Sequence, residues 1–262
     1  MLRKFFVTTV FLVFVFHVNS VFAGKLDEFE EGAASEGSKP TKKVLRQSEE
    51  DNTAGSLLGD IFGLLFDAAF DGLSAAGKYS FYKAESSFSP QEHPNLKPRK
   101  NGQRLVPFFR LDALFGDLES DIELQDYTAE TGYGALSFSY RYSRFVEESP
   151  SDKLVLDQYF FNYRMTLGDR TQLDLGFGTY GLKGDQDLSD SAFRLGFAWI
   201  GDSHLGVEYN YVFTEGDRLK VNDQELALLY SHDYISLKTS YRIINGGSAD
   251  LRGPTIGLSF HF

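Results

Sequence analysis

The last nine residues of the chain alternate strictly in side-chain character, and this alternation limits the fold more than any other feature of the sequence. Ile256, Leu258, Phe260 and Phe262 fall on one face together with Pro254, whereas the residues between them are small or polar. Successive side chains of a β-strand point to opposite faces, so the segment is predicted to be a strand with one apolar face. The same period-two pattern recurs upstream, which predicts an all-β fold over residues 104–262.

Ten segments with this alternation follow one another along the chain. The connections between them alternate between tight turns and longer polar loops, as they do when antiparallel strands run up and down around a barrel. The sequence therefore predicts an up-and-down antiparallel β-barrel of ten strands, with eight strands as the alternative if residues 104–132 lie outside the wall. The predicted strands cover 104–116, 121–132, 135–146, 153–167, 171–182, 191–200, 204–214, 222–231, 234–244 and 253–262.

The two faces of each predicted strand differ in size as well as in polarity. In the strand at 191–200, Phe193, Leu195 and Phe197 share one face, and Arg194 and Gly196 share the other. A soluble barrel buries its bulky apolar side chains, but a narrow lumen has room only for small and polar ones. The pattern favours a transmembrane barrel whose bulky face meets lipid, with an aromatic-rich soluble β-sandwich as the alternative.

Charged residues on the face assigned to the lumen are the candidate functional residues. Unpaired charges are costly to desolvate in a narrow interior, so we expect them to form an ion-pair network that closes the barrel. Six are basic and four are acidic, and this excess of basic groups favours, as an alternative, a narrow passive channel with a weak anion preference. The predicted network consists of Arg110, Asp112, Arg141, Arg164, Asp174, Arg194, Glu208, Glu225, Lys238 and Arg242.

A chain that ends on such a strand, with a terminal Phe, resembles the small outer-membrane β-barrel proteins of Gram-negative bacteria. The resemblance covers about residues 104–262 and lies in the pattern rather than in a match to one characterised member. It implies contact with outer-membrane lipid and insertion by the barrel-assembly machinery. In this chain the assembly signal would comprise Ile256, Leu258, Phe260 and Phe262. Proteins of this kind serve in envelope integrity, surface contact or limited transport.

The first 23 residues have the composition of an export signal. Arg3 and Lys4 precede a mostly apolar run, and Val21 and Ala23 offer small residues at the two recognition positions for cleavage. The run is short, which favours a secretory signal peptide over an uncleaved membrane helix. Together with the resemblance, it predicts an outer-membrane location with the N-terminal extension in the periplasm.

Three segments separate the signal from the barrel. Residues 24–54 are polar and acidic and are predicted to form a disordered arm, either a solvated linker or a binding segment for a periplasmic partner. Residues 55–76 have apolar residues at helical spacing, which predicts a short amphipathic helix that docks on the barrel base, pairs with another copy or lies at the membrane edge. Residues 77–103 combine prolines with basic residues and predict a linker.

Composition narrows the remaining classes of function. The net charge of −11 argues against nucleic acid as a partner. Cysteine is absent, which excludes disulfides and zinc sites of the cysteine type. No motif in the sequence predicts a metal or another cofactor.

The five histidines argue against catalysis. Barrels that modify lipids or cleave peptides need a histidine near Ser, Asp or Glu on the outer side. His17 lies in the signal, His93 lies in the linker, and His204, His232 and His261 lie at the end with the tight turns. We therefore predict a non-enzymatic outer-membrane barrel with a structural or interaction role in the envelope. A lipid-modifying enzyme is kept as an alternative beside the channel.

Overall fold

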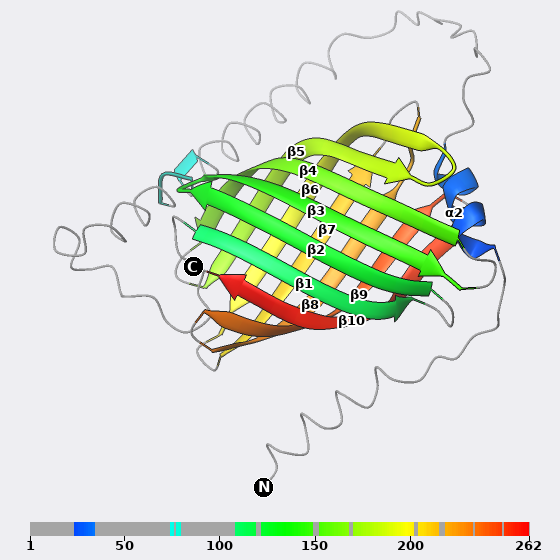
Figure 1. The fold of residues 1–262 in the computed structure, drawn as a ribbon. Helices are drawn as coiled ribbons and strands as arrows, with labels where there is room; N and C mark the ends of the chain where they lie inside the picture. The colour runs from blue at the N-terminus through cyan, green and yellow to red at the C-terminus, as the bar shows by residue number, and fades with distance from the viewer. Residues whose placement is uncertain are drawn as a thin grey trace, which may run out of the picture.

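The computed structural model describes residues 24–34, 74–75, 77–79, 108–118, 122–148, 152–167, 170–201, 204–214, 218–232, 234–247 and 249–261. Ten strands form one closed barrel in which each strand pairs antiparallel with its neighbours and β10 pairs with β1 (Figure 1). This confirms the predicted all-β, up-and-down antiparallel barrel of ten strands. The strands are β1 (Phe108–Leu118), β2 (Ile122–Tyr133), β3 (Leu136–Glu147), β4 (Asp152–Leu167), β5 (Thr171–Lys183), β6 (Asp187–Ile200), β7 (Leu205–Thr214), β8 (Asn222–His232), β9 (Ile235–Gly246) and β10 (Ala249–His261).

The first two strands belong to the wall, so the eight-stranded alternative is wrong. β1 pairs along its whole length with β2 and also with β10, where Arg110 lies opposite His261 and Phe115 lies opposite Ile256. Two strands begin four residues earlier than predicted, β6 at Asp187 and β10 at Ala249. Their backbone hydrogen bonds continue beyond the point where the side-chain alternation fades, because the ladder does not depend on side-chain polarity.

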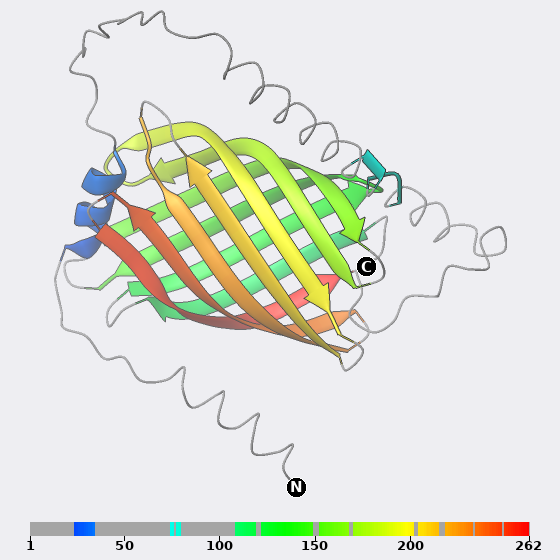
Figure 2. The same cartoon turned by 180° about the vertical axis from the view of Figure 1, so that it is seen from behind.

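The connections define two different ends of the barrel. The turn end carries the connections β2–β3, β4–β5, β6–β7 and β8–β9, and the loop end carries the other five. The first residue of β1 and the last residue of β10 both lie at the turn end, as an even number of antiparallel strands requires. Figures 1 and 2 show the C-terminus at this end.

A helix, α2 (Lys25–Ala33), lies across the loop end, on the opposite side of the barrel from the C-terminus (Figures 1 and 2). The sequence predicted a disordered arm over 24–54, and for these residues that prediction is wrong. Leu26, Phe29 and Ala33 recur at helical spacing, and all three are buried among apolar side chains inside the barrel. Three apolar residues among acidic ones give a weak pattern, and the helix depends on the apolar surface that receives them.

Little of the chain between α2 and β1 is described. Gly77 is buried against the side chain of Tyr163, on the outer wall of β4 near the turn end. Among the residues that the structure describes, no helix is both long and apolar enough to cross a membrane. Outside the described residues lie the predicted signal peptide (1–23), nearly all of the predicted helix (55–76), most of the predicted linker (77–103) and the terminal Phe262.

Large apolar side chains cover the outer wall from the turn end to the middle of the barrel. Phe161 and Phe177 are each 57% exposed, and Tyr230 is 54% exposed. They belong to a band that passes through every strand, in which neighbouring rings contact each other, as Phe177 and Phe193 do at 5.3 Å between centroids. Exposed apolar surface of this extent is stable only in contact with hydrocarbon.

The polarity of the wall is inverted near the loop end. Outward-facing side chains there are polar, as at Glu123 and Lys153, whereas the inward-facing side chains of Leu124, Leu154 and Leu156 are buried. The expectation of one consistently bulky outer face therefore holds only for part of each strand. The barrel combines a membrane-type wall at the turn end with a wall at the loop end that has the polarity of a barrel in water.

Candidate functional site

The ten charged residues predicted for the lumen all project inward. Eight are buried, and Arg141 and Arg194 are partly buried. They reach this position because each lies on the small, polar face of its strand, opposite the apolar band. The structure brings most of them together in one connected network.

The network begins near the turn end with Arg110 of β1. Its guanidinium lies 2.6 Å from Asp112 Oδ1 on the same strand and 2.7 Å from Glu208 Oε1 on β7, across the lumen. The hydroxyl of Ser259 donates a further hydrogen bond of 2.6 Å to Asp112. Lys238 of β9 continues the network, since its Nζ lies 3.4 Å from Asp112 and 2.8 Å from Glu225.

Two arginines carry the network onward to the loop end. Arg141 lies 2.7 Å from both Glu225 and Asp126. Arg242 lies 2.6 Å from both Asp126 and Asp223. Asp223 also accepts a 2.8 Å hydrogen bond from the amide of Gln158. A continuous chain of charge pairs thus runs from Arg110 to Asp223.

A second cluster of charges joins β2, β4 and β5. Arg164 of β4, one of the largest fully buried side chains, lies 2.7 Å from Glu130 and 3.2 Å from Asp174. Arg194 differs from the other predicted residues, because its two hydrogen bonds go to the neutral oxygens of Ser139 and Asn210, at 3.0 and 2.9 Å. It is placed in the lumen but is hydrogen-bonded rather than ion-paired there.

Three carboxylates of these two clusters were not predicted from the sequence. Asp126, Glu130 and Asp223 bring the four predicted acidic residues to seven, against six basic ones. The excess of basic charge that favoured an anion-preferring channel is therefore reversed. β2 carries polar residues on both faces, which hides its inward side, but Tyr127 and Tyr133 on the other face could have fixed its orientation.

Little space remains between these side chains. Cavities of about 20 and 30 Å³ lie among the described side chains of the lumen, and Arg110 and Glu208 border both of these. A buried water needs about 10–15 Å³ measured in this way, so each cavity has room for only one or a few water molecules. The described side chains of the network therefore lie close together across the lumen.

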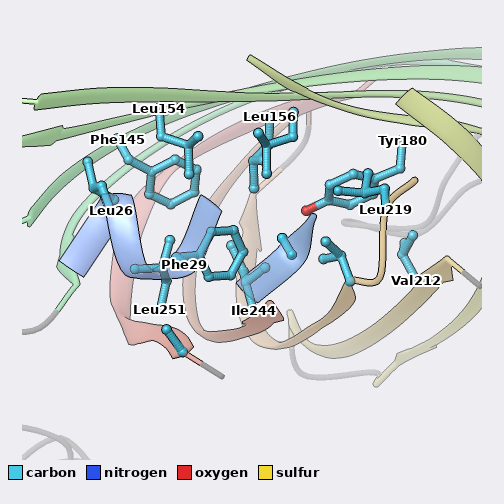
Figure 3. Packing of buried hydrophobic residues seen from close by; sticks show 14 of the residues in the cluster. Leu26, Phe29, Phe145, Leu154, Leu156, Tyr180, Val212, Leu219, Ile244 and Leu251 are labelled. Carbon is cyan, nitrogen blue, oxygen red and sulfur yellow. The ribbon is translucent and has the colours of Figure 1, made fainter. Parts of the chain in front are cut away.

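Above the network, toward the loop end, an apolar layer fills the lumen. Leu26 and Phe29 of α2 insert among Phe145, Leu154 and Ile244, all of them at most 1% exposed (Figure 3). Tyr180 belongs to the same layer, and its hydroxyl donates a 3.4 Å hydrogen bond to Asp223. Side chains thus occupy the lumen at two successive levels, first as ion pairs and then as apolar packing under α2.

Four of the five loop-end connections hold α2 in place. Glu147, at the end of β3, accepts hydrogen bonds from the first backbone N–H groups of the helix. Glu30 accepts hydrogen bonds of 3.1 and 2.6 Å from Asp185 N and Gln186 N in the β5–β6 connection. Lys220 N in the β7–β8 connection donates to Ala33 O at 2.8 Å. In the β9–β10 connection, Gly247 lies so close to the helix that a Cβ there would collide with the carbonyl of Gly32.

Charges around α2 perturb one another. The carboxylate of Asp152 raises the pKa of Asp27, with smaller contributions from burial and from Asp185. Burial lowers the pKa of Lys25, and the nearby Arg252 adds to this effect. The loop end therefore presents a rim of interacting charges around the helix.

The described histidines lie far from this rim. His204 and His232 stack at the turn end with ring centroids 6.3 Å apart, and His261 is buried at the last position of β10. In the described segments, no group of three or more His, Cys, Asp or Glu side chains is arranged to hold a metal ion.

Comparisons with known proteins do not place the chain in a family. No protein-family model matches it, and no curated protein matches it. Among solved structures it is similar to OmpTdeltaL8, a loop L8 deletion mutant of OmpT, described as an outer membrane protein of Vibrio cholerae. That similarity has a TM-score of 0.31 and 13% sequence identity over 60% of this chain, and it spans 59% of the solved chain.

Proposed function

We propose that this protein is a non-enzymatic β-barrel of a Gram-negative outer membrane, with a structural or interaction role in the envelope and a permanently closed lumen. The observation that carries the proposal is the combination of an apolar outer band with an interior closed at two levels. A porin needs an open lumen, whereas a barrel whose cross-section is filled acts through its wall and its exposed end.

The length of the connections gives the orientation, and the polarity of the wall supports it. Short turns face the periplasm in barrels of this kind, so the turn end is assigned to the periplasm and the loop end to the cell exterior. The inverted wall near the loop end supports this assignment, because it extends a water-compatible surface beyond the apolar band. Ile256, Leu258 and Phe260 are exposed on the outer face of β10, which suits their role in the assembly signal.

An interaction role would use the loop end. Asp27, Glu28 and Glu31 of α2 are exposed there, beside the polar connections of the barrel. The assigned orientation places residues 24–34 outside the cell, which departs from the expectation that the whole N-terminal extension lies in the periplasm. A periplasmic partner would then have to bind the part of 24–76 that follows Ala34. The three described histidines lie at the turn end, which supports the non-enzymatic proposal.

Planar-bilayer recording of the mature protein tests the closed lumen. The protein would be purified in detergent, and its folding would be checked by heat-modifiable migration in gels. We expect no reproducible current steps over a range of voltages, since the remaining cavities hold only a few waters. A porin of known conductance, recorded in the same bilayer, serves as the positive control.

Two results would favour the alternatives. Reproducible steps from the folded protein would contradict the closed lumen and favour a narrow passive channel. A change in the masses of outer-membrane lipids on expression of the protein would contradict the non-enzymatic proposal and favour a lipid-modifying enzyme.

A further inference from the structure

The helix that closes the barrel begins directly after the predicted cleavage site. The export signal is expected to end at Ala23, and Gly24 is the N-cap of α2. Glycine has no side chain with which to satisfy the free N–H groups at the start of a helix, and no side chain of the helix itself caps this end.

A carboxylate of the barrel takes the place of the missing cap. Glu147 Oε1 accepts hydrogen bonds from Gly24 N at 3.1 Å and from Lys25 N at 3.3 Å, and Oε2 accepts one from Leu26 N at 3.2 Å. Glu147 ends β3 and is only 2% exposed. An acidic side chain has therefore been placed, almost without contact to solvent, against the residue that would become the first of the mature chain.

We propose that the loop end is a binding site for the mature N-terminus of this chain, in which the α-ammonium group of Gly24 forms an ion pair with Glu147. The inference rests on the export signal of the proposed function. A signal-cleaving peptidase would hydrolyse the Ala23–Gly24 amide with one water molecule. Ala23 leaves as a carboxylate, and the nitrogen of Gly24 becomes a protonated amine.

Cleavage changes what Glu147 can bind. Before cleavage, Gly24 offers one neutral N–H donor, and afterwards it offers three donors and a positive charge. The carboxylate already strengthens the hydrogen bond from a neutral N–H, and an ammonium donor adds Coulombic attraction between opposite charges. A buried carboxylate also demands a nearby cation more than an exposed one does, because it has lost its hydration. Removal of the signal therefore fastens α2 over the apolar layer.

The fastening matters because α2 has little stability of its own. A helix of nine residues is unstable in water without tertiary contacts. Its apolar face and the Glu147 contact act at the same place, since Leu26 both donates to Glu147 and inserts into the apolar layer. Cleavage of the signal therefore stabilises the docked position of α2 at the loop end.

Amine labelling of the purified mature protein tests the ion pair. An acylating reagent near pH 7 modifies α-amino groups in preference to lysines, because their pKa is about 7.7–8.0 rather than about 10.4. Mass spectrometry then quantifies the modified N-terminal peptide. We expect the Gly24 amine of the folded protein to react about tenfold more slowly than that of the urea-unfolded chain, because it is held by a charge-assisted hydrogen bond.

Two glutamates give a matched pair of variants. Glu147→Gln keeps the shape of the side chain but removes its charge, and the rate of labelling should rise toward that of the unfolded chain. Glu148→Gln changes the next residue, which is exposed, and should label like the wild type. Heat-modifiable migration reports whether each variant has folded.

A second variant decides the matter if Glu147→Gln does not fold. One alanine inserted before Gly24 moves the amine by about 3.8 Å and leaves Glu147 intact. We expect this chain to be labelled faster than the wild type and to be cut more readily by trypsin after Lys25.

Three results would overturn the ion pair: equal labelling of folded and unfolded wild type, unchanged protection in both altered chains, or a mature chain that begins elsewhere than Gly24. None of them concerns conductance, so a closed lumen would stand. Conversely, current steps from a protein with a protected Gly24 amine would reject the proposed function and leave this inference intact.

Discussion

Arg242 shows how a single residue links several strands across the lumen. It projects from β9 and joins Asp126 of β2 to Asp223 of β8, so three strands meet at one guanidinium. Its Nη1 also donates a 2.8 Å hydrogen bond to Ser143 of β3. The planar guanidinium, with five N–H donors, can serve several acceptors at once, which a lysine at this position could not do in the same geometry.

Loss of this arginine should destabilise the barrel strongly. Arg242→Met preserves the approximate length of the side chain but leaves the Asp223 carboxylate hydrogen-bonded, among the described residues, only to the neutral Gln158 and Tyr180. Breaking one side of a buried ion pair costs about 3–5 kcal/mol, because the remaining charge stays desolvated. Urea unfolding of the protein in lipid vesicles would measure the change in free energy.

The exposed Arg218→Met is the matched control for that experiment, and it should change stability by no more than about 0.5 kcal/mol. If the two variants unfolded at the same urea concentration, the network would contribute nothing to the stability of the barrel.

At the scale of elements, α2 depends on the barrel for its stability more than the barrel depends on α2. The barrel strands are held by continuous ladders on both sides, whereas α2 is held by its apolar face and by polar contacts from three connections. Phe29 is fully buried, and Gly246 approaches it so closely that a Cβ there would lie 2.6 Å from its ring. The side chain and the space for it are therefore matched.

Phe29→Ala should release the helix without unfolding the barrel. Loss of a buried Phe costs about 3–5 kcal/mol. A short helix has little stability of its own, so a loss of this size should undock it. Hydrogen exchange followed by mass spectrometry should show fast exchange over 25–33 and unchanged exchange in β1 to β10. Glu31→Ala alters an exposed residue of the same helix and should leave the exchange of 25–33 as in the wild type.

Slow exchange over 25–33 in the Phe29→Ala protein would mean that the polar contacts alone hold α2. The apolar layer would then occupy the lumen without contributing to the docking of the helix.

At the scale of the whole molecule, the inversion of wall polarity divides the barrel into two environments. In β4, Phe161 faces outward and Asn162 faces inward near the turn end, whereas Lys153 faces outward and Leu154 faces inward near the loop end. Along one strand, the apolar side chains thus change from the outer face to the inner face. The level at which they change marks where the wall leaves the hydrocarbon.

Arginine substitutions at two heights should reveal that boundary. Phe177→Arg places a charge in the middle of the apolar band and should cost about 2–4 kcal/mol in a bilayer, whereas Ser189→Arg, outward-facing near the loop end, should cost about 0–1 kcal/mol. Urea unfolding in vesicles would compare the two. Equal costs would mean that the lipid boundary does not lie where the polarity inverts.

The sequence determined the barrel itself. Period-two alternation identifies a strand from local residues alone, because side chains alternate across any strand, and the alternation of tight and long connections indicated how the strands follow one another. Ten strands, their order and the inward position of the predicted charges followed from these local patterns.

Only the tertiary structure decided which charges meet and where α2 lies. Arg110 and Glu208 come from β1 and β7, which are not neighbours in the wall, so their contact depends on the closure of the barrel and on the register of every strand between them. Likewise, Leu26 and Phe29 form a helix because an apolar surface assembled from many strands receives them. Contacts and surfaces of this kind form only when distant strands come together, so a local sequence pattern cannot predict them.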